Sequence, residues 1–150
     1  GYSQYEVSAY NREGFNCRHN SNYWAFGDYL GIGAGAHGKI SFPDGRIKRY
    51  HKRRQPQEYM SVTPQEFIAS SRTLHHDEIA GEFMMNALRL NHGFTLQQFA
   101  SRTGLDSMLL EPQLELLCQR ELLVRSKGNV RATDTGRRFL DSVIAEFFSA

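Results

Sequence analysis

The spacing of hydrophobic residues changes near Thr63, and this change constrains the fold of the chain more than any other feature. Before it, short segments such as Tyr5–Tyr10 alternate polar with apolar or aromatic residues, as strands do. After it, apolar residues recur every three or four positions, as in Asp77–Leu90, which is typical of amphipathic helices. The chain has 150 residues, 40% of them hydrophobic, enough for one modest core or two small ones. An α+β protein is therefore predicted.

The first part of the chain is expected to form strands joined by turns. Tyr5–Tyr10 predicts one strand, and Asp28–Ile32 predicts a second that runs into glycines. Lys39–Phe42 and Arg46–Tyr50 flank Pro43-Asp44-Gly45, a turn tripeptide between β-compatible arms. These arms predict a hairpin.

Two helices are expected next. Thr63-Pro64-Gln65-Glu66 puts a capping threonine before a proline, with a glutamate three residues after the threonine. This start signal predicts a helix that runs to about Leu74. The pattern of Asp77–Leu90 predicts a second helix that ends near Asn91-His92-Gly93.

The last third of the chain predicts the order helix, helix, hairpin, helix. Helices are expected at Thr95–Arg102, Asp106–Glu121 and Arg137–Phe148, and Leu122–Thr133 is expected to form a two-stranded ribbon with a glycine turn. This order is typical of a winged helix-turn-helix. The second helix carries three glutamates and one arginine, so it would repel phosphate. Internal packing or protein docking is therefore favoured over DNA binding.

The glycine-rich segment Gly31–Gly38 does not predict a dinucleotide site. That fingerprint requires a helix directly after the glycines, so that the helix N-terminus meets the pyrophosphate. Here Lys39–Pro43 follows, and it is extended in character. A structural tight turn is one interpretation of these glycines.

Positive charge is concentrated in Lys48–Arg54. Residues 1–60 hold nine lysines and arginines against five acidic residues, whereas residues 61–150 hold nine against eleven. A basic run attracts phosphates, anionic lipid head groups or propionates, so peripheral association with a membrane stays open. The alternative is a solvated edge strand whose charges block further pairing.

Cysteine usage limits the chemistry of the chain. Only Cys17 and Cys118 are present, far apart in sequence, so neither a disulfide framework nor a zinc site of paired cysteines is predicted. A reducing cytoplasm is the expected location. No apolar run approaches the roughly 20 residues that span a bilayer, and the start at Gly1 resembles no signal peptide. Because the chain lacks an initiator methionine, we expect it to be part of a longer protein.

The run His19-Asn20-Ser21-Asn22-Tyr23-Trp24 is the main candidate binding site. It groups an imidazole, two amides and two large aromatics, including the only tryptophan of the chain. Imidazole is a common ligand of iron, and flat aromatic side chains can wall a flat cofactor such as haem. The alternative is local core packing, because a single histidine is a weak metal signal. The order of residues suggests no serine-histidine-acid or cysteine-histidine set, so no catalytic residue is predicted.

The order of motifs resembles the C-terminal part of the HemW-type haem chaperones, which belong to the radical-SAM coproporphyrinogen III oxidase-like (HemN-like) family. The resemblance is carried by Tyr5–Tyr10, His19–Trp24 and Gly27–Gly38, within residues 5–54. A weaker likeness continues through Glu82–Leu90 to the end.

This resemblance implies an α+β architecture in three parts. Residues 1–60 would hold the last strands of a partial radical-SAM (β/α) barrel, residues 61–94 a helical connector and residues 95–150 a C-terminal winged-helix domain. The resemblance also implies that the full-length protein, here called the parent, holds a 4Fe-4S cluster and S-adenosylmethionine (SAM). Three clustered thiolates would be needed for the cluster, and the chain has two distant cysteines. Radical chemistry is therefore expected to need residues outside this chain.

The family's haem-binding pattern, His-Asn, two variable residues, Tyr-Trp, is complete in this chain. It implies that His19 ligates the haem iron axially and that Tyr23 and Trp24 line or buttress the pocket. Asn20 would hold the local turn. A hydrogen bond to the other ring nitrogen of the histidine would hold its tautomer.

Two further residues are implied on the SAM side of the parent. His37 stands at a position that contacts SAM in oxidase relatives, although a purely structural turn is an equal alternative. Asn11 follows Tyr10, where relatives usually carry an alanine that lies against SAM. If that contact is made by backbone, the asparagine is harmless; if it needs a small apolar side chain, SAM binding is weakened.

The leading functional hypothesis is the C-terminal part of a haem chaperone that binds haem and delivers it to acceptor apo-proteins such as respiratory enzymes. One alternative is the substrate side of an oxygen-independent coproporphyrinogen III oxidase in porphyrin biosynthesis. Another is a winged-helix protein-interaction module. Retention of His19–Trp24 favours the chaperone. The chain alone is not expected to be an enzyme, whereas the parent is open to being a radical-SAM oxidoreductase.

Overall fold

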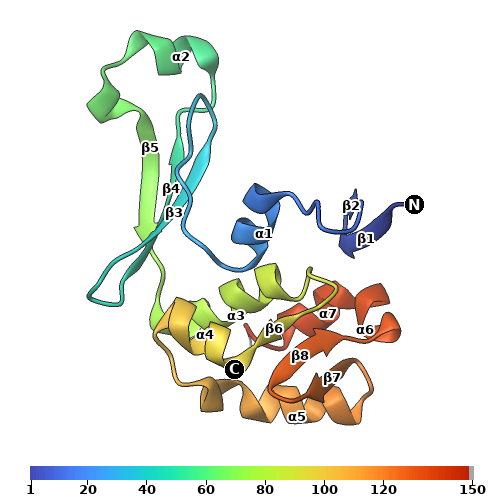
Figure 1. The fold of residues 1–150 in the computed structure, drawn as a ribbon. Helices are drawn as coiled ribbons and strands as arrows, with labels where there is room; N and C mark the ends of the chain where they lie inside the picture. Colours follow the sequence, from blue (N-terminus) through green and yellow to red (C-terminus); the bar gives the residue numbers. More distant parts are fainter. Residues whose placement is uncertain (149–150) are drawn as a thin grey trace. The chain divides into compact units, whose positions relative to one another are not determined.

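A computed structural model describes residues 1–148 of the chain (Figure 1). These residues form two compact units, which are described separately. Unit 1 combines Gly1–Phe26 with the chain from His76 onward, and unit 2 is Gly27–His75. Both helices and sheets are present, so the predicted α+β class is confirmed. Within residues 1–148, no helix has the length and apolar character needed to cross a membrane.

Unit 1 begins with a small hairpin of β1 (Ser3–Glu6) and β2 (Ala9–Asn11), followed by helix α1 (Arg18–Trp24). The prediction of one continuous strand over Tyr5–Tyr10 is therefore wrong. The chain reverses at Val7-Ser8, where the Ser8 hydroxyl donates to the Glu6 carboxylate across 2.8 Å. Such a local side-chain hydrogen bond favours a turn over an extended backbone.

The rest of unit 1 is a set of helices around a three-stranded antiparallel sheet with strand order β6-β8-β7. The longest helix, α3, spans His76–Ala87. The remaining elements follow in chain order: β6 (Phe94–Thr95), α4 (Leu96–Thr103), η2 (Ser107–Leu110), α5 (Glu111–Gln119), β7 (Leu123–Ser126), β8 (Asn129–Ala132), α6 (Asp134–Arg138) and α7 (Leu140–Ala145).

Most predictions for this region are confirmed. Helix α4 begins after Thr95, whose hydroxyl accepts a hydrogen bond from the Gln98 backbone, and it ends at Gly104 in a left-handed conformation. The helix predicted over Asp106–Glu121 starts instead with a 3-10 turn, and the final helix is interrupted at Phe139. The hairpin β7-β8 forms as expected.

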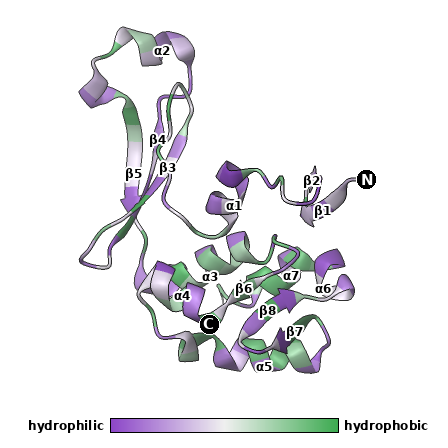
Figure 2. Cartoon of the chain, in the orientation of Figure 1, coloured by the Kyte–Doolittle hydropathy of each residue, from purple (hydrophilic) through white to green (hydrophobic). Residues whose placement is uncertain are grey.

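Aromatic rings form the centre of the unit 1 core. The fully buried Phe83 of α3 meets Phe26, Phe94 and Phe99 edge to face, with ring centroids 5.5, 5.1 and 5.1 Å away. Edge-to-face pairs stabilise the core beyond the area that they bury. Figure 2 shows hydrophobic colours concentrated on α3, α5 and α7 of this unit.

Unit 2 is an antiparallel sheet of β3 (His37–Ser41), β4 (Ile47–Lys52) and β5 (Ile68–Thr73), with short helices at Pro56–Ser61 (α2) and Pro64–Glu66 (η1) between β4 and β5. The predicted hairpin over residues 39–50 is confirmed by the β3-β4 pairing. The predicted strand at residues 28–32 is wrong, since only an isolated bridge joins Tyr29 to Lys39. Every strand pair within residues 1–148 is antiparallel.

The helix predicted from Thr63 to Leu74 is wrong beyond its first turn. The start signal is real: the Glu66 carboxylate accepts hydrogen bonds from the backbone N–H and hydroxyl of Thr63. The following Ile68–Thr73 then forms β5, because its apolar residues make no helical stripe and the edge of β4 offers backbone partners.

An ion pair between the buried Lys39 and the exposed Asp28 holds the start of unit 2 against β3. The Lys39 ammonium lies 2.8 Å from the Asp28 carboxylate, which also accepts hydrogen bonds from the backbone and hydroxyl of Ser41. Partial burial raises the pKa of Asp28, but the hydrogen bonds from Lys39 and Ser41 outweigh it and lower the pKa overall.

Asp28→Asn is therefore expected to lower the thermal stability of unit 2 at neutral pH. A carboxylate whose pKa is lowered by folding stabilises the fold above its unfolded pKa of about 3.9, and that stabilisation is lost as the pH falls through the lower, folded value. The difference in melting temperature between the wild type and the variant should thus shrink below about pH 4. A difference that stays constant from neutral to acidic pH would contradict this role for the carboxylate.

Candidate functional site

Helix α1 carries the His19–Trp24 motif in unit 1. The helix has no side-chain cap, because Cys17 precedes it in an extended conformation without a capping hydrogen bond. Residues four apart share a helix face, so His19 lies in line with Tyr23, and Asn20 lies in line with Trp24. The four motif residues therefore occupy two neighbouring rows of one short helix.

The Asn20–Trp24 row holds α1 in place. The Asn20 amide lies 3.4 Å from the Tyr5 hydroxyl of β1, a long hydrogen bond that reaches another element rather than a turn of its own helix. The Trp24 ring meets the Tyr23 ring edge to face, with centroids 4.6 Å apart and planes at 86°. Both rings are half-buried, so they support α1 and still present a surface.

His19 has a different environment. Its side chain is exposed at the first turn of α1, whereas Asn20, Tyr23 and Trp24 are half-buried. An exposed imidazole can reach a ligand without displacing core atoms. Packing in a local core, the alternative left open for this residue, does not describe its position.

Arg89 joins the motif, although sequence reasoning did not single it out. Its guanidinium lies over the Trp24 ring, 4.3 Å from the centroid, within range of a cation-π interaction. The Nη2 atom also lies 3.5 Å from the Glu6 carboxylate and 3.3 Å from the Ser8 hydroxyl. Arg89 follows α3 and is far from the motif in the sequence, so no local pattern could have found it.

The N-terminal hairpin fixes the Arg89 backbone. The N–H of Val7 donates to the Arg89 carbonyl across 3.1 Å, and the N–H of Asn91 donates to the Tyr5 carbonyl across 3.0 Å. Glu6, almost fully buried, bridges to Leu90 between these bonds. The guanidinium therefore projects from a backbone held on both sides.

Two N–H groups in this cluster have no acceptor. The Nε1 of Trp24 and the Nε of Arg89 are both buried, and neither has a hydrogen-bond partner among residues 1–148. A buried donor without an acceptor costs about 1–3 kcal/mol, so each of these groups requires an acceptor from ordered water or from a ligand. An exposed imidazole, two aromatic rings, a guanidinium and two spare donors fit haem, which combines iron, a flat apolar ring and carboxylates.

Asn11, implied on the SAM side, is buried in unit 1. Its amide donates to the Asn16 side chain, and its own carbonyl oxygen lies 3.5 Å from the Ser3 hydroxyl. The side chain is thus engaged within the N-terminal segment.

His37, the second residue implied on the SAM side, lies in unit 2. It is exposed and sits opposite His51 in the β3-β4 register, with ring centroids 5.7 Å apart. Both imidazoles line a cavity of about 510 Å³ together with Gly35, Lys52 and Arg54. Two permanent cations and two imidazoles make this cavity suited to an anionic group. No cluster of three or more potential metal ligands occurs in the part of the chain that the structure describes.

Comparison with known proteins confirms the resemblance to the HemN-like proteins. Residues 74–139 match the HemN C-terminal domain family. A search of solved structures finds that the fold resembles that of the Escherichia coli coproporphyrinogen III oxidase (HemN), described as a radical SAM enzyme. The TM-score is 0.63 at 14% identity, over 99% of this chain and 37% of the other.

Curated relatives are similar along nearly the whole chain. The chain is 40% identical to the heme chaperone HemW of Escherichia coli (strain K12), over 99% of this chain and 39% of that protein. It is 38% identical to the heme chaperone HemW of Haemophilus influenzae, over 99% of this chain and 38% of that protein. A mitochondrial radical S-adenosyl methionine domain-containing protein 1 of Dictyostelium discoideum is 28% identical, over 96% of this chain and 37% of that protein. The chain therefore spans less than two fifths of the length of these relatives.

Proposed function

We propose that the chain is the C-terminal part of a haem chaperone, which binds haem as cargo and passes it to apo-proteins. The observation that carries the proposal is the exposed His19 on a helix whose Trp24 lies under Arg89, with a buried N–H donor without an acceptor on each of these two side chains. Similarity to heme chaperones over 99% of the chain supports it.

In this proposal each motif residue has its own task. His19 offers an imidazole nitrogen to the iron of the cargo, and Tyr23 and Trp24 present aromatic surface to its ring. Asn20 keeps α1 attached to β1 through Tyr5. The iron supplies an open coordination position, and the protein residues supply binding and orientation.

The architecture of the parent follows the same resemblance. We assign residues 1–60 to the last strands of a radical-SAM-type barrel, residues 61–94 to the connector and residues 95–150 to a winged-helix domain. The order α3, β6, α4, α5, β7, β8 supports the winged helix, because a helix, a short strand, two helices and a hairpin follow one another in that fold. Barrel strands of residues 1–60 would pair with strands that precede this chain.

The remaining cofactors and partners belong to the parent. A 4Fe-4S cluster and SAM would be held by residues outside this chain, with Asn11 and His37 on the SAM side. Acceptors would be haem-binding apo-proteins such as respiratory enzymes, reached in the cytoplasm or at a membrane surface. The basic residues of β4 support contact with anionic surfaces.

One alternative is the substrate side of a coproporphyrinogen III oxidase, and the likeness to the HemN fold favours it. It predicts that the reconstituted parent converts coproporphyrinogen III to protoporphyrinogen under anaerobic conditions with SAM. Absence of turnover, together with haem binding, would favour the chaperone. The second alternative, a winged-helix interaction module, predicts no haem binding at all.

Haem binding by the full-length parent should depend on His19. In a titration followed by absorption spectroscopy, His19→Ala is expected to weaken haem binding at least about tenfold and to shift the Soret band, because an axial ligand is lost. His92→Ala is the matched control, since His92 is also exposed in unit 1 but lies outside the motif. Unchanged affinity and spectra for His19→Ala would overturn the ligand assignment.

A further inference from the structure

We propose that Arg89, held over the ring of Trp24, binds a carboxylate of the cargo, so that the site recognises haem by a propionate as well as by its iron. This inference rests on the proposed function and adds a second recognition element to the same site. Propionates lie at one edge of the macrocycle, away from the iron. A propionate receptor must therefore stand apart from the axial ligand.

Arg89 meets that requirement. Trp24, which its guanidinium covers, lies five residues after His19 on α1, or about 7.5 Å along the helix axis. The His19 imidazole and the Arg89 guanidinium thus lie beside the same helix at different positions along its axis. The aromatic ring of Trp24 lies against the guanidinium and links the two recognition elements.

The guanidinium is prepared for a planar anion. Its backbone is tied to Val7, its Nη2 atom lies near Glu6 and Ser8, and its flat face lies on Trp24. Arginine has five N–H donors in a rigid fork that matches a carboxylate. Only Nη2 makes hydrogen bonds to other residues in the described part of the chain, and Nε is buried without an acceptor.

The neighbouring charges leave room for a second anion. The Glu6 carboxylate is 3.5 Å from Arg89, the outer limit of a hydrogen bond, so it does not saturate the guanidinium. The Nε1 of Trp24, whose ring lies under the guanidinium, is another buried donor without an acceptor among residues 1–148. A carboxylate has about four acceptor positions, enough to accept from more than one N–H donor.

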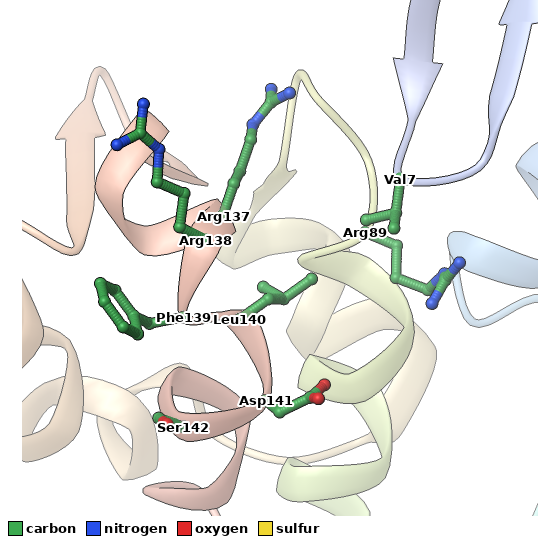
Figure 3. A pocket seen from close by; sticks show the side chains of 8 residues that line it. All are labelled: Val7, Arg89, Arg137, Arg138, Phe139, Leu140, Asp141 and Ser142. Atoms are coloured by element: carbon green, nitrogen blue, oxygen red, sulfur yellow. The ribbon is translucent and has the colours of Figure 1, made fainter.

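A cavity lies beside Arg89. It has a volume of about 380 Å³, and its eight lining residues include three arginines, the apolar Val7, Phe139 and Leu140, and one carboxylate, that of Asp141. Figure 3 shows the Arg89 guanidinium turned away from those of Arg137 and Arg138. Arg137 and Arg138 therefore raise the positive potential of the cavity, whereas the Arg89 guanidinium points out of it and lies over the Trp24 ring of α1.

The test compares haem with haem dimethyl ester, in which both propionates are esterified, on the full-length parent. The wild type is expected to bind haem at least about tenfold more tightly than the ester, a difference of at least about 1.4 kcal/mol, because a charge-assisted hydrogen bond is lost in the ester. Arg89→Gln should weaken haem binding by a similar factor and leave binding of the ester unchanged. Arg89→Lys should weaken haem binding less than Arg89→Gln does, because lysine keeps the positive charge but lacks the planar pair of N–H donors of the guanidinium.

Two control variants separate specific recognition from general charge. Arg138→Gln removes the same charge from the same cavity but from a side chain that points elsewhere. Arg102→Gln removes it from the exposed last turn of α4, outside the cluster. Both should keep the wild-type preference for haem over the ester. Equal losses in Arg138→Gln and Arg89→Gln would overturn the assignment and point to a general positive potential.

The outcomes distinguish this inference from the proposed function. If the wild type binds haem and His19→Ala weakens binding, but the wild type holds haem and its ester equally well, the carboxylate site is wrong and the haem function stands. If the wild type binds neither compound, both proposals fail. The ester comparison on the wild type tests the carboxylate site even where Arg89→Gln does not fold.

Discussion

Phe83→Ala is expected to lower the free energy of unfolding of unit 1 by about 3–5 kcal/mol. Phe83 has no exposed surface, and its ring contacts three other phenylalanines, one just after α1, one in β6 and one in α4. Truncation removes these contacts and leaves a cavity that the surrounding helices can fill only in part. The loss is a large fraction of the stability of an ordinary domain.

The effect should appear in native-state hydrogen exchange of the full-length protein, at the amides of α3 and α4 that exchange most slowly. Met85→Ala is the matched control, because Met85 lies on the same helix with a side chain that is 38% exposed. Its expected loss is about 0.5–1 kcal/mol. Similar losses for the two variants would show that Phe83 is not the centre of the core.

Gly93→Ala is expected to destabilise unit 1 by about 3 kcal/mol or more, through two separate causes. Gly93 has a φ of +70°, a left-handed conformation that costs an L-residue about 1–2 kcal/mol. An added Cβ would also lie only 1.9 Å from the Val130 carbonyl of β8. Overpacking of this kind adds about 1–3 kcal/mol, because β8 has to move.

Gly104→Ala separates the two causes. Gly104 has a φ of +73° at the end of α4, but a Cβ there would meet no atom within 4 Å. It should therefore show the cost of the backbone conformation alone, about 1–2 kcal/mol by the same measurement. Losses of equal size for Gly93→Ala and Gly104→Ala would contradict the close approach of Gly93 to β8.

Gly93 also matters for the site. The segment after α3 begins with Arg89. Leu90 and Asn91 follow and contact β1. Gly93 comes next and lies against β8. A shift of Gly93 would move the backbone that positions Arg89. Gly93→Ala should consequently reduce the preference of the parent for haem over haem dimethyl ester, although it leaves every donor in place.

Local signals in the sequence predicted much of unit 1 and the central hairpin of unit 2. The helix expected over Thr95–Arg102 and the Pro43-Asp44-Gly45 turn both appear in the expected places. Caps and turns depend on residues a few positions apart, so they can be recognised without knowledge of the rest of the fold.

The errors lie where distant segments or side-chain contacts decide the structure. The capping box at Thr63 forms, but the chain beyond it pairs with β4 instead of continuing as a helix. The Tyr5–Tyr10 segment turns at Ser8 rather than staying extended. In the first case a neighbouring strand, and in the second a side-chain hydrogen bond, outweighed a weak intrinsic preference.

The sequence by itself determined the His19–Trp24 motif and its likeness to haem chaperones. These properties depend on the identity and order of neighbouring residues. Only the tertiary structure decided that His19 is exposed, that Trp24 lies under Arg89, and that two buried N–H groups remain without acceptors among residues 1–148. The reason is physical: Arg89 reaches the motif because β1 pairs with the segment after α3, and no local pattern encodes a contact between segments so far apart.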